Sequence, residues 1–171
     1  ILDFSLFSQS FFGRVYARDN KFFKRSYKIY VNTVCHILND VGININTVPV
    51  LDVRRNAASN FINDRSFSND PKIVSKIGKI CIELYKKNKI GTITKHIPGH
   101  GGSHTDSHLA TPFIKTTKKK LINIDFKPFK SCKSLFTMTA HAIYKSYDVK
   151  NVCTHSEIIL NNLIRKKIKF K

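Results

Sequence analysis

The sequence predicts an α/β fold, because three stretches typical of β-strands alternate with helical stretches along the chain. The strand stretches begin near residues 44, 90 and 134, so a strand–loop–helix unit recurs about every 45 residues. Such a recurrence implies parallel strands joined by right-handed crossovers. It fits an open doubly wound sheet and a closed eight-stranded barrel equally well. In both folds the functional loops follow the carboxyl ends of the strands.

The first predicted helix covers residues 19–41, where apolar side chains recur every three or four residues. Asp19 can cap the start of this helix, and Gly42 can end it. The next stretch, residues 43–53, is rich in β-branched side chains and predicts a strand. Pro49 cannot donate a hydrogen bond to a neighbouring strand, so we expect a bend or bulge at that position.

The second unit starts with Asp70 and Pro71, which provide an N-cap and a proline at the first helical position. An apolar stripe follows, formed by Ile73, Ile77, Ile80, Cys81, Leu84 and Tyr85. This spacing predicts a second amphipathic helix. Residues 90–97 then predict a second strand, which ends in a glycine-rich loop.

The remainder of the chain predicts a third unit. A short helix begins near Thr117, and we expect Pro128 to disturb it. A third strand covers residues 134–141, and Ser156 caps a final helix. Three polar residues at or beyond strand ends mark the expected functional edge, and these are Asp52, His96 and His141. The first and the last of them are expected to shape the pocket.

The composition limits the class of protein. At 171 residues with 42% hydrophobic content, the chain is long enough for one domain with its own core and too polar for a membrane protein. No apolar run reaches the roughly 18 residues that would span a bilayer, and we recognise no targeting segment. Four cysteines lie far apart with no C-x-x-C pair, namely Cys35, Cys81, Cys132 and Cys153. They are typical of reduced core residues and favour a cytoplasmic location.

The formal net charge of +19 raises the question of a polyanionic partner such as nucleic acid. The basic residues are mostly lysines, dispersed among many Asn, Ile and Phe residues, as expected from an AT-rich genome. Basic runs at 118–120 and 165–167 fall at helix ends or on helix faces, where lysines are ordinarily solvated. We therefore expect neither a nucleic-acid partner nor a membrane partner. A basic nucleic-acid-binding module is kept as a rival interpretation.

Residues 95–112, after the second strand, hold an unusual concentration of histidine. Four histidines recur at every fourth position and would share one face of a helix, as metal ligands can; these are His96, His100, His104 and His108. Pro98 and the neighbouring glycines oppose a continuous helix, so we expect no metal site. A metal-dependent hydrolase is a second rival interpretation. A third alternative is that the histidines only fill a polar loop.

A catalytic interpretation of the same loop rests on Asp106 and His108. A loop can fold so that the carboxylate accepts the imidazole Nδ1–H, which fixes the tautomer and turns Nε2 toward a substrate. An unperturbed imidazole titrates at a pKa of about 6.5, so it can donate a proton to a leaving oxygen and take one from water. His108 would then act as both acid and base.

At these residues the sequence resembles the β-N-acetylglucosaminidases of glycoside hydrolase family 3. Their signature loop usually reads K-H-F-P-G-H-G-x4-D-S-H-x3-P, and residues 95–112 match its spacing with Ile97 in place of the usual Phe. Further segments agree in the same order, and these are residues 48–53, 64–71 and 138–144. The resemblance spans roughly residues 44–168.

The resemblance implies that residues 1–171 are part of the family's (β/α)8 barrel domain, present as about three strands with their helices. It also implies that His108 is the general acid/base, that Asp106 orients it, and that Arg65, Lys95 and His96 bind N-acetylglucosamine. The implied activity is retaining hydrolysis of terminal non-reducing β-linked N-acetylglucosamine in cytoplasmic peptidoglycan recycling. No cofactor and no metal are implied. The partner is a carbohydrate from the cell wall, and we expect a monomer at full length.

A retaining glycosidase also needs a nucleophilic carboxylate, because the covalent intermediate forms by attack from the opposite face of the sugar. In the family this Asp follows the next strand, and residues 168–171 resemble the stretch just before that strand. We therefore expect the nucleophile to be missing from the chain. Three strands out of eight cannot close a barrel, so we expect the isolated chain to fold poorly and to be inactive.

Overall fold

The computed structural model of the protein describes residues 6–55, 62–103 and 110–170. Within these ranges, a parallel sheet has the strand order β1 (Ile45–Asn46), β2 (Gly91–Ile97) and β4 (Phe136–Thr139). Strand β2 is central, and its Ile93 lies opposite Phe136 of β4 in parallel register. A separate parallel pair joins β3 (Phe113–Ile114) to β5 (Ile143–Tyr144). The parallel arrangement confirms the predicted α/β class.

Strand β1 is much shorter than the strand predicted over residues 43–53, and that part of the prediction is wrong. After two residues the ladder with β2 stops, and it resumes only as a single parallel bridge between Val50 and Lys95. Pro49 lies in this gap and has no N–H to donate, which confirms the interruption expected there. The main chain still follows β2, because the Leu51 N–H donates to the Lys95 carbonyl oxygen at 2.7 Å.

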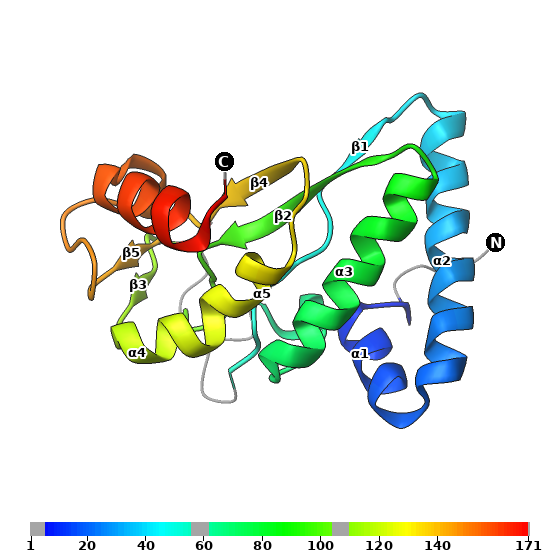
Figure 1. The fold of residues 1–171 in the computed structure, drawn as a ribbon, viewed down its shortest axis with the longest axis horizontal. Coiled ribbons are helices and arrows are strands. Elements are labelled where there is room, and N and C mark those ends of the chain that lie inside the picture. Colours follow the sequence, from blue (N-terminus) through cyan, green and yellow to red (C-terminus); the bar gives the residue numbers. More distant parts are fainter. Residues whose placement is uncertain (1–5, 56–61, 104–109, 171) are drawn as a thin grey trace.

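Two long helices pack on one another beside the sheet. Helix α2 (Asn20–Asp40) begins after the predicted cap, whose Asp19 carboxylate accepts the Phe22 N–H at 2.9 Å. Helix α3 (Pro71–Lys87) begins after its predicted Asp70 cap. In Figure 1, α3 lies between α2 and strand β2. Helix α2 confirms the predicted bounds closely and α3 confirms the predicted start, because their caps are local signals.

Helix α1 (Gln9–Arg18) was not predicted from the sequence. It packs against α2 through aromatic rings, and the Phe12 ring centroid lies 4.7 Å from that of Tyr27 and 6.5 Å from that of Phe23. All three rings are buried. This aromatic contact extends the core along α2, away from the sheet (Figure 1).

Residues 118–131 form one helical path whose hydrogen-bond pattern changes along its length. Its parts are α4 (Lys118–Lys120), the π-helical η3 (Leu121–Asp125) and α5 (Phe126–Ser131). The helical path begins next to Thr117, as expected, and the Thr117 side chain accepts the Lys120 N–H. Pro128 has no N–H for the carbonyl of Ile124, and the π-helical part covers that position. The disturbance expected from Pro128 is confirmed, but the helix continues beyond it to Ser131.

The final helix, η5 (Ile158–Ile168), is π-helical, and the Ser156 hydroxyl accepts the Ile159 N–H at 3.1 Å near its start. The four cysteines are all buried and free, which confirms their interpretation as reduced core residues. Across the described ranges, none of the helices is both long enough and apolar enough to span a bilayer.

Candidate functional site

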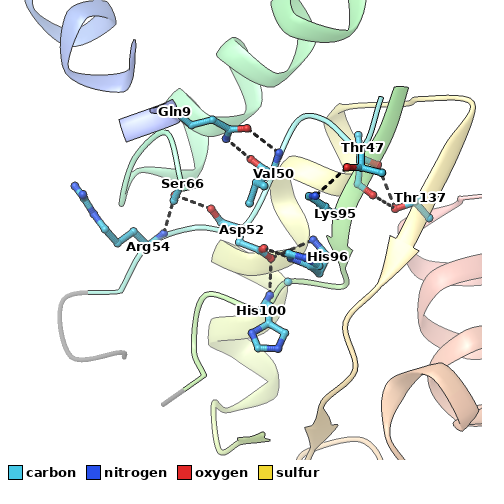
Figure 2. A network of polar contacts seen from close by, with 12 residues as sticks. Gln9, Thr47, Val50, Asp52, Arg54, Ser66, Lys95, His96, His100 and Thr137 are labelled. Carbon is cyan, nitrogen blue, oxygen red and sulfur yellow. Dashed lines mark hydrogen bonds and ion pairs between the residues drawn. The ribbon is translucent and has the colours of Figure 1, made fainter. Parts of the chain in front are cut away.

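Asp52 lies at the carboxyl end of the sheet and has several polar contacts there. Its carboxylate is fully buried and contacts two segments of the histidine-rich loop (Figure 2). Oδ2 lies 2.7 Å from His96 Nδ1, and Oδ1 accepts the main-chain N–H of His100 at 2.6 Å. The site therefore has a buried carboxylate at its base.

The charge of Asp52 is stabilised by these contacts. Burial alone would raise the pKa of this carboxyl, because the interior solvates a charge poorly. The charge and hydrogen bond of His96, followed by those of His100, outweigh burial and lower the pKa below its ordinary value. Asp52 is therefore an anion at neutral pH and an acceptor of hydrogen bonds.

His96 lies on strand β2 beside Lys95, and its side chain is 15% exposed. When Nδ1–H donates to the Asp52 carboxylate, the second ring nitrogen, Nε2, carries the lone pair. The Asp52 carboxylate thus fixes the orientation of the His96 ring, and part of the ring stays accessible to solvent. Such a ring can form one directional hydrogen bond to a sugar hydroxyl.

Lys95 and Arg65 supply positive charge at the same place. The Lys95 ammonium donates to the Thr47 hydroxyl at 3.1 Å (Figure 2). The pKa of Lys95 is lowered, first by burial and then by the charge of Arg65, which is therefore nearby. Arg65 ends the short 3₁₀ helix η2 (Asn63–Arg65) and is exposed. The structure thus brings the three predicted sugar-binding residues, Arg65, Lys95 and His96, to one edge of the sheet.

The loop after β2 is packed too tightly for side chains at its glycines. A Cβ at Gly101 would lie 1.9 Å from the Val53 carbonyl oxygen. Gly99 has φ +127°, and its carbonyl oxygen accepts the Tyr144 hydroxyl at 2.7 Å. No helix forms over residues 98–103, so the four-residue histidine spacing does not place ligands on a helical face there. Among the residues described, no group of three or more His, Cys, Asp or Glu could hold a metal ion.

The predicted catalytic pair, Asp106 and His108, lies outside the described residues. The described part of the loop ends at Ser103, which is buried.

A second buried carboxylate, Asp125, supports the same loop from the helical side. It forms a hydrogen-bonded ion pair with Arg55, and its Cβ would lie 2.7 Å from a Cβ at Gly99. Burial raises the pKa of Asp125 to about 7, although Arg55 acts in the opposite direction. The pair joins the segment after Asp52 to the helix that follows the loop.

Sequence reasoning placed Asp52 and His141 at the functional edge but outside the site. For Asp52 the structure shows direct contact with His96, a partner 44 residues away in the chain. The available signal was an acidic residue at the end of a strand-like stretch, which does not reveal its partner. His141 is exposed and has Nδ1 3.4 Å from the Thr154 hydroxyl.

Comparisons with known proteins agree on one family. The model of the glycosyl hydrolase family 3 N-terminal domain matches residues 26–171. A curated relative, the beta-hexosaminidase of Idiomarina loihiensis, is 37% identical over 132 residues, which are 76% of this chain and 39% of that protein. The crystal structure of native NagZ from Neisseria gonorrhoeae aligns with a TM-score of 0.88 and 26% identity, covering 96% of this chain and 48% of that one.

A second structure of the gonococcal protein, in complex with N-trifluoroacetyl-D-glucosamine, aligns with a TM-score of 0.86 and 26% identity, covering 96% of this chain and 49% of that one. The chain thus spans about half the length of the gonococcal structures and less of the curated relative. It corresponds to part of a barrel, as expected.

Proposed function

Because the chain belongs to glycosyl hydrolase family 3, we propose that its full-length protein removes terminal non-reducing β-linked N-acetylglucosamine by hydrolysis with retention of configuration. The relatives support the substrate class, since they are named beta-hexosaminidases and a NagZ structure contains a glucosamine derivative. The observation that carries the proposal is the convergence of Arg65, Lys95 and His96 at the carboxyl edge of parallel strands.

The proposed sugar contacts follow from the chemistry of these groups. Arg65 and Lys95 are donors that can bind sugar hydroxyls, and His96 adds a directional contact through Nε2. Their positive charges lie close together, which lowers the pKa of Lys95 after the larger effect of burial. An uncharged ligand with many hydroxyl groups suits this site. Its hydroxyl oxygens can accept several hydrogen bonds from Arg65 and Lys95, and the ligand need not carry a negative charge that cancels theirs.

The proposed chemical step uses His108 as general acid and then as general base. Asp106 would accept its Nδ1–H and keep Nε2 directed toward the glycosidic oxygen. The two buried carboxylates of the site, Asp52 and Asp125, are bound by His96 and Arg55. We therefore propose that the nucleophilic carboxylate comes from another residue of the full-length protein.

Replacing His108 with Ala tests this proposal. In the full-length protein His108→Ala is expected to lower kcat by about 100-fold or more, the usual contribution of general acid–base catalysis. The loss should be larger for an alkyl N-acetylglucosaminide than for a nitrophenyl one, because a poor leaving group needs protonation most. His104→Ala is the matched control in the same loop and should change kcat little. Equal losses in both variants would contradict the assignment.

We further propose that the protein acts as a monomer in the cytoplasm on fragments of recycled peptidoglycan. The four buried, free cysteines support a reducing compartment. The 171-residue chain by itself is proposed to be inactive.

A further inference from the structure

We propose that Asp52 is a positioning residue with two separate tasks, and this inference rests on the function proposed above. One oxygen orients the His96 ring for its contact with the sugar. The other oxygen anchors the turn that leads toward the predicted acid/base. One buried carboxylate would thus couple substrate binding to the path of the turn that precedes the predicted catalytic pair in the sequence.

The first task follows from the contact of Oδ2 with His96 Nδ1 at 2.7 Å. A carboxylate can only accept, so the ring nitrogen facing it must carry the proton. The neutral ring then has its lone pair at Nε2. His96 is partly exposed while Asp52 is fully buried, so the ring meets the ligand and the carboxylate does not.

The second task follows from the contact of Oδ1 with the His100 N–H at 2.6 Å. His100 is buried within the glycine-rich turn, and the chain continues from it to Ser103. A short charge-assisted bond to a main-chain N–H sets the path of the backbone rather than the position of one side chain. In the sequence, this turn directly precedes the segment that holds Asp106 and His108.

The position of Asp52 is itself fixed from the other side. Its main-chain carbonyl oxygen accepts the Ser66 hydroxyl at 2.7 Å, and that hydroxyl also accepts the Arg54 N–H at 3.2 Å (Figure 2). Ser66 follows Arg65 directly in the chain. The segment around Asp52 therefore joins the loop of Arg65 to the loop of His96 and His100.

Two substitutions separate the two tasks. Asp52→Asn keeps an oxygen that can accept the His100 N–H, but it presents an NH₂ group to His96 Nδ1. The ring must then accept at Nδ1 and carry its proton on Nε2. Asp52→Ala removes both the ring partner and the anchor of the turn. Asp148→Ala is the matched control, because Asp148 is a buried carboxylate that accepts main-chain N–H groups in a different turn.

The kinetic test uses the full-length protein with a chromogenic N-acetylglucosaminide. Asp52→Asn should raise KM by about tenfold with little change in kcat, which is the size expected for one impaired hydrogen bond. Asp52→Ala should also lower kcat, because the turn loses its anchor. Asp148→Ala should leave both constants near those of the unsubstituted protein. The same fall in kcat and the same rise in KM in both Asp52 variants would overturn the proposal.

The tautomer of His96 gives a readout that a purely structural role would not change. Imidazole ¹⁵N shifts are measured at about pH 8.5, with the His96 signals identified by their loss in His96→Gln. We expect a protonated Nδ1 in the unsubstituted protein and a protonated Nε2 in Asp52→Asn. An unchanged tautomer would overturn the inference. An unsubstituted protein that shows the expected tautomer but neither binds nor cleaves the sugar would instead contradict the proposed function.

Discussion

At the scale of single residues, Asp125 shows how burial and pairing compete at one carboxyl. Its side chain is 1% exposed, and burial is the largest influence on its pKa. The neighbouring Arg55 lowers the pKa but does not cancel burial, so the value stays at about 7. The folded protein therefore binds a proton at Asp125 at pH values where the unfolded chain has released it.

The stability of the protein should depend on pH through this carboxyl. Below about pH 4 both states are protonated at Asp125, and above about pH 7 both are ionised. Between these values the free energy of unfolding should fall as pH rises, by on the order of 1 kcal/mol per pH unit. In Asp125→Asn this contribution should disappear, which urea unfolding at a series of pH values can measure.

Asp148→Asn is the control for the Asp125 experiment. The hydroxyl of Ser156 and nearby N–H groups lower the pKa of Asp148 to about 2. That carboxyl is largely ionised in both states above about pH 5, so its removal should leave the slope between about pH 5 and 7 unchanged. A slope that persists in Asp125→Asn would show that another group is responsible.

At the scale of elements, strand β2 and the turn after it organise the site. The strand is paired on both sides, with β1 and with β4, and its last residues carry Lys95 and His96. The turn then passes so close to Val53 that only a hydrogen atom fits at Gly101. Strand β2 and this closely packed turn therefore support the segment that directly precedes the predicted catalytic loop in the sequence.

Gly101→Ala should disturb this support. The added Cβ meets a main-chain carbonyl oxygen at 1.9 Å, so the backbone must shift, and overpacking of this kind costs about 1–3 kcal/mol. Urea unfolding measures the loss, and kcat in the full-length protein should fall with it. Gly42→Ala is the control, because Gly42 has φ +76° but open space around its Cα. If Gly42→Ala proved as damaging to kcat as Gly101→Ala, close packing of the turn would not be the cause.

At the scale of the whole molecule, the described sheet has two edges and apolar side chains on its surface. Leu135 is 72% exposed, and on β4 Phe136 and Met138 are 47% and 40% exposed. Such surface is ordinarily covered by further protein. The chain spans 48% of the gonococcal structure, so the uncovered side of the sheet is where further strands of a barrel would pack.

The 171-residue chain alone should therefore show no measurable hydrolysis of a chromogenic N-acetylglucosaminide. A barrel active site is built from loops that follow strands all around its mouth, and one arc of strands provides only part of them. The assay compares the purified chain with the full-length protein at equal molar concentration. Cleavage by the purified chain above the background rate would refute this expectation.

The sequence by itself determined the α/β class, the parallel strands, the bounds of α2 and the start of α3. These depend on short-range signals, such as the helix caps at Asp19 and Asp70 and the spacing of apolar residues within the helix that follows each cap. The family resemblance also predicted that Arg65, Lys95 and His96 bind the sugar, and the structure brings these residues to one edge of the sheet. The length of β1, the helix α1 and the π-helical segments did not follow from these signals, because tertiary packing and the prolines decide them.

Only the tertiary structure decided which residues the buried carboxylates of the site contact. Asp52 meets His96 across 44 residues, and Asp125 meets Arg55 across 70 residues. The spacing of apolar residues in the sequence does not predict such pairs. It indicates which face of a helix or strand is buried, but not which distant residue a side chain contacts. A buried charge requires a specific counter-charge or donor, and the fold chooses that partner by bringing distant segments within hydrogen-bonding distance.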